Sequence, residues 1–221
     1  MRFLLNTFGY LFGIGVVLGL IAAGAVGFYI SKMSEDLPEY TQLRNYEPPV
    51  MTRIHASNGS LVAEYATERR LFLPIQAIPS IIKEAFLSAE DKNFYSHNGV
   101  DVGGVFRAAV TNFRNRGSGR RPVGASTITQ QVAKNFLLTN EVSIERKIKE
   151  AILALRMEQA YTKDRILELY LNEIYLGMGA YGVAAAALVY FDKSVHELTL
   201  AEVAYLAALP KAPNNYNPFR E

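Results

Sequence analysis

The sequence predicts a mainly α-helical protein in which one domain, carrying a small β element, follows a single transmembrane helix. Three observations predict this: an uncharged apolar segment at the N-terminus, one hairpin turn signal, and helical periodicity with capping residues from residue 79 onward. The chain has 221 residues, half of them hydrophobic, which is enough for one domain with a substantial core. The absence of cysteine excludes disulfides and thiolate catalysis, whereas the net charge of +2 neither favours nor excludes an anionic partner.

The N-terminal segment has no charged residue between Phe3 and Ser31, and residues 8–30 are almost wholly apolar. A helix over these residues would be about 35 Å long, which is enough to cross a hydrocarbon core of about 30 Å. The positive-inside rule then places residues 1–7, with Arg2, in the cytoplasm and the chain after Ser31 outside. A cleaved signal peptide is the alternative, since residues 22–25 are small, although the apolar segment continues past them.

A connector and a small β element follow the apolar segment. Residues 31–50 contain three prolines and are predicted to form a juxtamembrane connector. In residues 51–73, the turn signal is Ser-Asn-Gly-Ser at 57–60, because Asn-Gly readily takes two positive φ angles. We expect flanking strands at 51–56 and 61–66, with a third strand at 71–73.

The remaining chain is predicted to be helical. Apolar residues recur at helical spacing up to Glu90, and residues 112–124 form a loop rich in Arg and Gly. Thr127 and Gln130 form a capping-box pattern that begins the next helix, and Thr199 with Glu202 begins the last, which Pro210 stops. Between these two helices we expect three more, at residues 143–160, 163–176 and 184–190.

Two adjacent carboxylates, Glu90 and Asp91, stand where a helix ends. The negative end of the helix dipole disfavours acids there, so local propensity gives no reason for them and a catalytic role is favoured. His97 follows near a glycine-containing turn, where a histidine is more often a hydrogen-bonded structural group than a catalyst.

Two further helices carry polar side chains that could bind an anion. Thr127, Gln131, Lys134 and Asn135 recur on one face, and helix N-termini and lysines favour phosphate, although the P-loop spacing is absent. In the helix at 143–160, Arg146 and Glu150 share a face with two apolar residues, Leu153 and Met157. That face is either a cleft wall or the site of an ordinary surface ion pair.

These clusters, in this order, closely resemble the peptidoglycan glycosyltransferases of family 51, which include the class A penicillin-binding proteins and the monofunctional transglycosylases. The shared patterns are Glu-Asp-x-x-Phe-x-x-His-x-Gly, Gly-x-Ser-Thr-Ile-Thr-Gln-Gln-x-x-Lys-Asn, Arg-Lys-x-x-Glu and Lys-Asp-x-Ile-Leu-Glu-x-Tyr-Leu-Asn, which begin at residues 90, 124, 146 and 163. The resemblance covers about residues 50–218, and the glycosyltransferase domain is expected at 51–218. Its β element and its block at 198–218 are most similar to the N-terminal part of 1A-type class A proteins.

The resemblance implies a lysozyme-like, mainly α fold that polymerises lipid II, with inversion at C1 of the donor MurNAc and release of undecaprenyl pyrophosphate. Glu90 would be the catalytic base for the acceptor 4-hydroxyl, and Glu150 would be the second catalytic carboxylate. Most of the implied substrate-binding residues fall into three groups: Lys134, Arg146 and Lys147 at the pyrophosphate, Thr127, Gln131 and Tyr170 at the donor, and Asp91, Phe94 and His97 around Glu90. Asn135 is a further expected substrate-binding residue.

The resemblance also implies the surroundings of the enzyme. It implies a single-pass protein of the bacterial inner membrane with a periplasmic catalytic domain. The expected partners are lipid II, the growing glycan strand, membrane lipids and other cell-wall synthesis proteins, and we expect no nucleic acid. No cofactor is required, although a divalent cation (Mg²⁺ or Mn²⁺) at the pyrophosphate is compatible with the family. The sequence shows no metal-ligand cluster.

Residues 219–221 are expected to begin a linker or to be a truncated end, and no transpeptidase motif occurs in this chain. We therefore expect no transpeptidase activity. Two rival functions remain. A muramidase-type hydrolase would also use two carboxylates, but it has no pyrophosphate for the cations to neutralise. A membrane-tethered scaffold would need none of these motifs.

Overall fold

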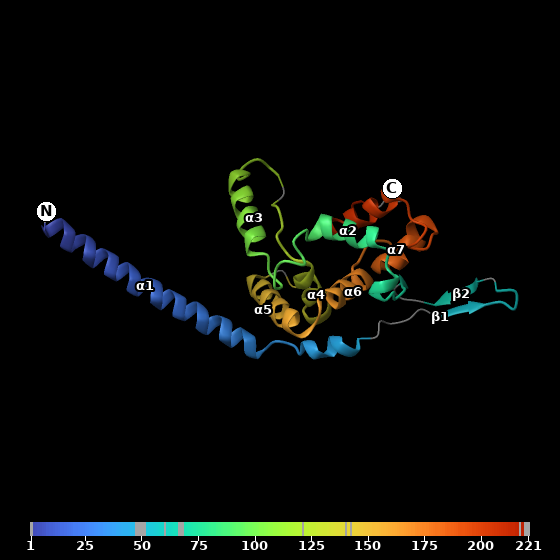
Figure 1. Cartoon of the computed structure of the whole chain (residues 1–221), viewed down its shortest axis with the longest axis horizontal. Coiled ribbons are helices and arrows are strands. Elements are labelled where there is room, and N and C mark those ends of the chain that lie inside the picture. The colour runs from blue at the N-terminus through green and yellow to red at the C-terminus, as the bar shows by residue number, and fades with distance from the viewer. Residues whose placement is uncertain are drawn as a thin grey trace.

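The computed structural model describes residues 2–46, 52–59, 61–65, 69–120, 122–139, 141, 143–216 and 218. The mainly α-helical fold is confirmed, with a long N-terminal helix extending away from a compact helical body (Figure 1). The α helices are α1 (Arg2–Glu35), α2 (Ser80–Glu90), α3 (Val102–Arg114), α4 (Ile128–Leu137), α5 (Ile144–Ala160), α6 (Lys163–Glu173), α7 (Gly182–Phe191) and α8 (Leu200–Ala208). Short 3-10 helices lie at Tyr40–Asn45, Ile75–Ala77 and Leu209–Lys211.

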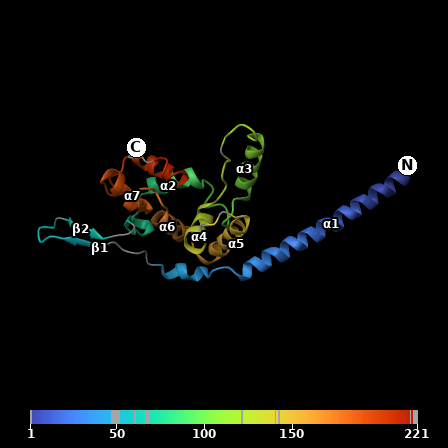
Figure 2. The ribbon, with the colours of Figure 1, turned by 180° about the vertical axis from the view of Figure 1, so that it is seen from behind.

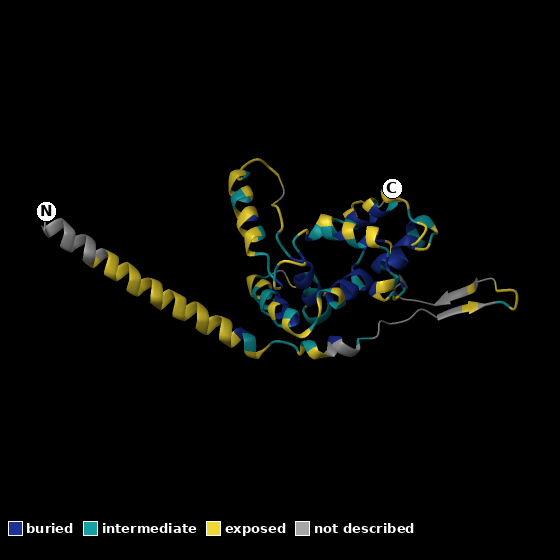
Figure 3. Ribbon diagram, viewed as in Figure 1, coloured by how far each residue is buried: buried dark blue, intermediate teal, exposed yellow. Residues whose placement is uncertain are grey.

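Helix α1 projects from the body, and its described residues are exposed along most of its length (Figure 3). The stretch Phe12–Glu35 is long and apolar enough to cross a membrane, with a mean hydropathy of 2.1. The helix extends beyond the predicted span of residues 8–30 at both ends.

The residues after α1 are fastened to the helical body. Met33 and Leu43 are buried, and Arg156 of α5 donates hydrogen bonds to Ser34. The Tyr161 hydroxyl donates to the Tyr40 carbonyl oxygen at 2.8 Å. The described part of the predicted connector, residues 31–46, is therefore packed against α5 and the start of α6. Residues 47–50 of the connector lie outside the described residues.

The predicted hairpin is present, but its turn and the third strand differ from the prediction. Strands β1 (Thr52–His55) and β2 (Leu61–Tyr65) are antiparallel. In the turn, Gly59 takes a positive φ of 84° whereas Asn58 does not, because the loop is longer than two residues. The predicted strand at 71–73 is wrong: β3 is Arg69–Arg70, which pairs in parallel with β4, Ala180–Tyr181.

The core centres on α6, whose residues 166–172 are buried on every side between neighbouring helices. Helices α4 and α5 pack together and α4 also packs on α6, while α2 packs on α8. The capping predictions are confirmed: Thr127 and Thr199 each form a complete capping box. These caps fix where α4 and α8 begin, and α4 supplies several side chains of the site.

The sequence analysis missed helix α3, which stands beside the body in both ribbon views (Figures 1 and 2). The loop predicted at residues 112–124 was placed too early in the chain, because α3 continues to Arg114. Two glycines in the first turn, Gly103 and Gly104, lower the helix propensity. Asp101 offsets this cost by accepting a hydrogen bond from the Gly104 N–H at 2.8 Å.

Gly182→Ala is expected to destabilise the fold strongly. Gly182 has a φ of 78°, and a Cβ there would lie 2.5 Å from the Asn172 carbonyl oxygen of α6. We expect a loss of several kcal/mol, read as a lower midpoint of thermal unfolding in detergent. Gly179→Ala is the matched control, because Gly179 has a φ of 71° with nothing within 4 Å. That control should cost only about 1 kcal/mol, and equal losses in both variants would refute the steric argument.

Candidate active site

A cavity of about 470 Å³ brings together residues that are up to 122 positions apart in the chain. It contains both predicted catalytic carboxylates, Glu90 from the end of α2 and Glu150 from α5, together with Lys134 and Lys147. The other residues that line it are Ala89, Pro122, Val123, Gly124, Ser126, Gln130, Gln131 and Lys211.

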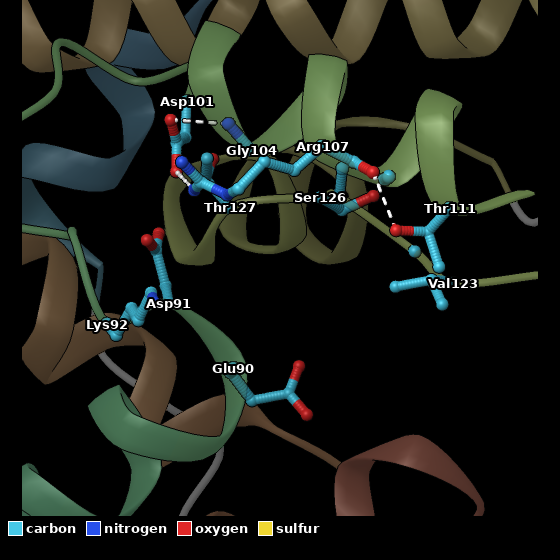
Figure 4. A pocket seen from close by; sticks show the side chains of 13 residues that line it. Glu90, Asp91, Lys92, Asp101, Gly104, Arg107, Thr111, Val123, Ser126 and Thr127 are labelled. Atoms are coloured by element: carbon cyan, nitrogen blue, oxygen red, sulfur yellow. Dashed lines mark hydrogen bonds and ion pairs between the residues drawn. The ribbon is translucent and has the colours of Figure 1, made fainter.

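Glu90 is the last residue of α2, and its side chain is partly exposed to the cavity. The Gln131 Nε2 donates a hydrogen bond of 2.8 Å to Glu90 Oε2. This hydrogen bond orients one oxygen of the carboxylate that lines the cavity. Figure 4 shows that Glu90 and Asp91 point in different directions, so the two adjacent acids have different surroundings.

Asp91 is buried and connects α2 to the start of α4. Its carboxylate accepts a hydrogen bond from the Ile128 N–H at 2.9 Å, which is a favourable place for a negative charge. His97 Nε2 lies 3.0 Å from both oxygens of Asp91, and His97 Nδ1 accepts from the Gly99 N–H. Since Nδ1 is an acceptor, the proton is on Nε2 and is donated to Asp91. His97 therefore positions Asp91, as the structural interpretation predicted.

Glu150 is buried, with 1% of its surface exposed. It forms ion pairs with Arg146, one turn away, and with Lys147 at 2.6 Å. This burial rules out the surface-pair alternative and makes this face of α5 the wall of a cleft. Lys147 also donates to the Ser126 hydroxyl at 3.0 Å, which joins α5 to the loop before α4.

Lys134 is a half-buried cation on α4 that faces the same cavity. Burial lowers the pKa of its ammonium group, and the charges of Arg146 and Lys147 lower it further, while Glu150 opposes them. The cavity thus gathers more positive charge than Glu150 alone offsets. Such a site favours an incoming anion, whose negative charge would raise the lowered pKa of Lys134.

The other predicted site residues lie behind the cleft wall or outside it. Phe94 and Tyr170 are each 1% exposed, and the Thr127 hydroxyl donates to the Gly99 carbonyl oxygen at 2.5 Å. Burial raises the pKa of the Tyr170 hydroxyl well above its ordinary value, as do the charges of Glu90 and Asp91. Phe94 and Tyr170 support the wall, Thr127 lines an adjoining cavity, and Asn135 lies exposed on α4.

The sequence analysis missed Lys211, which the structure places in the cavity with Glu90. Its only sequence signal was the block at 198–218, to which no role was assigned. Two further cavities also meet at Glu90. One, of about 220 Å³, extends toward Asp101 and Arg107 of α3 (Figure 4). The other, of about 490 Å³, extends toward α8.

No group of three or more His, Asp or Glu side chains placed to hold a metal ion occurs in the described ranges. Glu150, the carboxylate nearest the cations, is already paired with Arg146 and Lys147. The side chains in the described part of the chain therefore do not fit a metal site made by the protein alone.

Comparison with known proteins shows the family. Residues 58–221 match the transglycosylase family. The chain belongs to this family. It is 59% identical over 202 residues to penicillin-binding protein 1A of Rickettsia bellii, covering 91% of this chain and 26% of that protein. With penicillin-binding protein 1A of Neisseria lactamica it shares 47% identity over 218 residues, covering 98% of this chain and 26% of that protein.

A solved structure also matches this transglycosylase. The crystal structure of penicillin-binding protein 1A from Haemophilus influenzae is 28% identical, with a TM-score of 0.40, and the match covers 80% of this chain and 16% of that one. This chain spans about a quarter of the length of the curated relatives it matches. The family match and the curated relatives confirm the resemblance at the level of the family, because the chain belongs to the transglycosylases.

Proposed function

We propose that this transglycosylase polymerises lipid II into glycan strands with inversion at C1 of the donor MurNAc. The observation that carries the proposal is the meeting of Glu90 with Lys134, Lys147 and Glu150 in one cavity. Such a site can remove a proton at one end and offset the charge of an anionic leaving group at the other.

Glu90 would act as the general base. The Glu90 oxygen that Gln131 does not hold accepts the proton of the acceptor GlcNAc 4-hydroxyl. At the same time, the oxygen of that hydroxyl forms a bond to C1 of the donor MurNAc. The bond from C1 to the pyrophosphate oxygen breaks, and its electron pair leaves with undecaprenyl pyrophosphate. Because the leaving group departs from the opposite face of C1, the configuration inverts. Gln131 keeps Glu90 oriented through its 2.8 Å hydrogen bond.

The cations would stabilise the leaving group. Pyrophosphate departs readily once its charge is offset, so Lys134, Lys147 and Arg146 matter more than a strong acid. Glu150 holds Lys147 and Arg146 in place through ion pairs, at the donor end of the cavity. The cations also favour a polymerase over a muramidase-type hydrolase, whose glycan substrate carries no pyrophosphate. Helix α1 would hold the domain at the inner membrane, with the N-terminus cytoplasmic and the catalytic domain periplasmic.

The direct test is incubation of the detergent-solubilised chain with labelled lipid II. We expect lengthening glycan polymer and released undecaprenyl pyrophosphate, with no shortening of a preformed glycan strand. Shortening of glycan without polymer formation would support the hydrolase instead. A folded sample that does neither would support the scaffold.

The pH dependence of polymerisation should report on Lys134. Because the pKa of Lys134 is lowered, this lysine loses its charge at a lower pH than an ordinary lysine. We expect kcat/KM to fall as the pH rises through that lowered pKa, since the anionic donor loses a cation. Lys134→Arg should remove this fall, because a guanidinium stays charged. An unchanged alkaline limb in the variant would assign the fall to another group. Lys149→Arg, on the outside of α5, is the control.

A further inference from the structure

We propose that Lys163 is a positioning residue: with its ion-pair partner Glu158, it holds the loop after Glu90 and the start of α4 in place relative to each other. The proposal rests on the proposed polymerase function and concerns residues that act on Glu90 only through others. Neither Lys163 nor Glu158 is among the described residues that line the three cavities at Glu90, so neither is placed to touch the substrate.

Lys163 occupies a position that helix stability does not favour. Thr162 caps α6 by accepting a hydrogen bond from the Arg165 N–H, which makes Lys163 the first residue of the helix. The N-terminal end of a helix carries partial positive charge, so a cation is unfavourable there, whereas the next residue, Asp164, suits that end. The reason for a lysine at this position therefore lies in the contacts of its side chain with the rest of the fold.

The Lys163 ammonium group contacts the loop after Glu90 and the end of α5 at once. It donates to the His97 carbonyl oxygen at 2.6 Å and to Glu158 Oε1 at 2.7 Å. It also lies 4.4 Å from the centre of the Phe94 ring, which is within the range of a cation–π interaction. The Lys163 side chain is 20% exposed and the Glu158 side chain is 5% exposed, so solvent screens this ion pair little.

One set of contacts leads from Lys163 to the residue next to the base. Lys163 binds the backbone of His97, and the His97 imidazole binds the carboxylate of Asp91 at 3.0 Å. Asp91 directly follows Glu90 in the chain. Inside the loop, the Phe94 N–H donates to the Asp91 carbonyl oxygen at 3.0 Å, so the loop closes on itself. A shift of the far end of this loop would therefore move the backbone beside Glu90.

A second set of contacts leads to α4, which supplies the group that orients Glu90. Glu158 Oε1 accepts a hydrogen bond of 2.6 Å from the Thr129 hydroxyl, in addition to the one from Lys163. Thr129 is fully buried in the first turn of α4, and Gln131, two residues later, donates to Glu90. Helix α4 also packs on α5 and α6, the helices that carry Glu158 and Lys163 (Figure 1). The two sets of contacts thus fix both partners of the hydrogen bond between Gln131 and Glu90.

The test compares Lys163→Met with the wild type, using the full chain in detergent and labelled lipid II. We expect kcat to fall about 10–100-fold, because a small misplacement of the base slows the reaction. The KM for lipid II should stay near that of the wild type, because the cations proposed to bind the pyrophosphate keep their ion pairs with Glu150. Lys163→Arg should recover most of the rate, since a guanidinium can bind the same carbonyl oxygen, carboxylate and ring.

Arg165→Met is the matched control. Arg165 lies in the same turn of α6 and forms a similar ion pair, with Glu168, but its other contact is the Leu43 carbonyl oxygen of the connector. Its removal should lower the midpoint of thermal unfolding and leave kcat unchanged.

A second variant separates positioning from stability. Lys163→Met leaves Glu158 buried and unpaired, so it should lower the unfolding midpoint as well as kcat. Adding Glu158→Gln removes that charge and keeps an acceptor for the Thr129 hydroxyl, so the midpoint should rise again while kcat stays low. If kcat rises together with the midpoint, Lys163 serves only stability and the proposal is wrong.

Amide hydrogen exchange tests the same contacts without substrate. Lys163→Met should speed exchange in residues 91–99 and 127–131, whereas Arg165→Met should leave exchange there unchanged. If Lys163→Met has this effect while the wild type makes no polymer, the fastening of the loop stands and the polymerase proposal fails. If the wild type polymerises, and Lys163→Met changes neither kcat nor exchange in residues 91–99, the positioning role is refuted.

Discussion

Glu90→Gln is expected to lower glycan polymerisation by about 10²–10⁴-fold, because the amide cannot accept the acceptor proton. The substitution keeps the size of the side chain and a hydrogen-bonding group facing Gln131, so the loss should fall on kcat rather than on folding. The measurement is the initial rate of polymer formation from labelled lipid II, with thermal unfolding compared in parallel.

Glu84→Gln is the matched control for this substitution. Glu84 lies on the same helix, α2, and is exposed, so its neutralisation should leave the rate unchanged. If Glu90→Gln retained wild-type polymerisation, Glu90 could not be the base, and Glu150 would be the remaining carboxylate in the cavity. A loss of rate accompanied by a large fall in the unfolding midpoint would show that the role of Glu90 is structural.

Glu150→Gln should have the second-largest effect, because it removes a buried charge that two cations share. Breaking a buried ion pair from one side typically costs about 3–5 kcal/mol. Glu150 is 1% exposed, so its surroundings give little solvent screening. The change should also lower the pKa of Lys134 further, since Glu150 is the charge that raises it. We expect a lower unfolding midpoint together with a polymerisation rate reduced at least tenfold.

A double-mutant cycle separates these two effects. Adding Arg146→Gln to Glu150→Gln removes one of the cations left unpaired, so part of the lost stability should return. Polymerisation should stay low, because Glu150 lines the cavity and Arg146 would help to offset the charge of the leaving group in the proposed mechanism. Recovery of both stability and activity in the double variant would show that Glu150 serves only to compensate Arg146.

The sequence was most informative where local physics decides the structure. Thr127 and Thr199 predicted where α4 and α8 begin, because a capping box acts within one helical turn. By contrast, β3 and β4 are two residues each and form only because residues 69–70 and 180–181 meet in the fold. No periodicity can be read from two residues. Helix α3 was missed because the two glycines in its first turn are residues more typical of a loop.

The site was predictable as a set of residues and much less so as a geometry. Ordered motifs picked out Glu90, Glu150 and Lys134, which the structure brings into one cavity. The same motifs also picked out Phe94 and Tyr170, which are buried in the core beside it. A motif includes residues that support the wall as well as residues that form its surface. Only packing separates the two, and packing also brought in Lys211.

The attachment of residues 33–46 to the helical body has a consequence for how this enzyme meets its substrate. Arg156 and Tyr161, which hold that segment, flank the C-terminal end of α5, the helix that carries Glu150. With α1 across the bilayer, the catalytic cavity would sit at a fixed height above the lipid surface. If the substrate is lipid II, as proposed, enzyme and substrate would diffuse in the same membrane plane, and the pyrophosphate would reach the cavity at a constant depth. Inserting residues ahead of Met33, on the membrane side of both attachments, would alter that depth without changing the residues of the cavity.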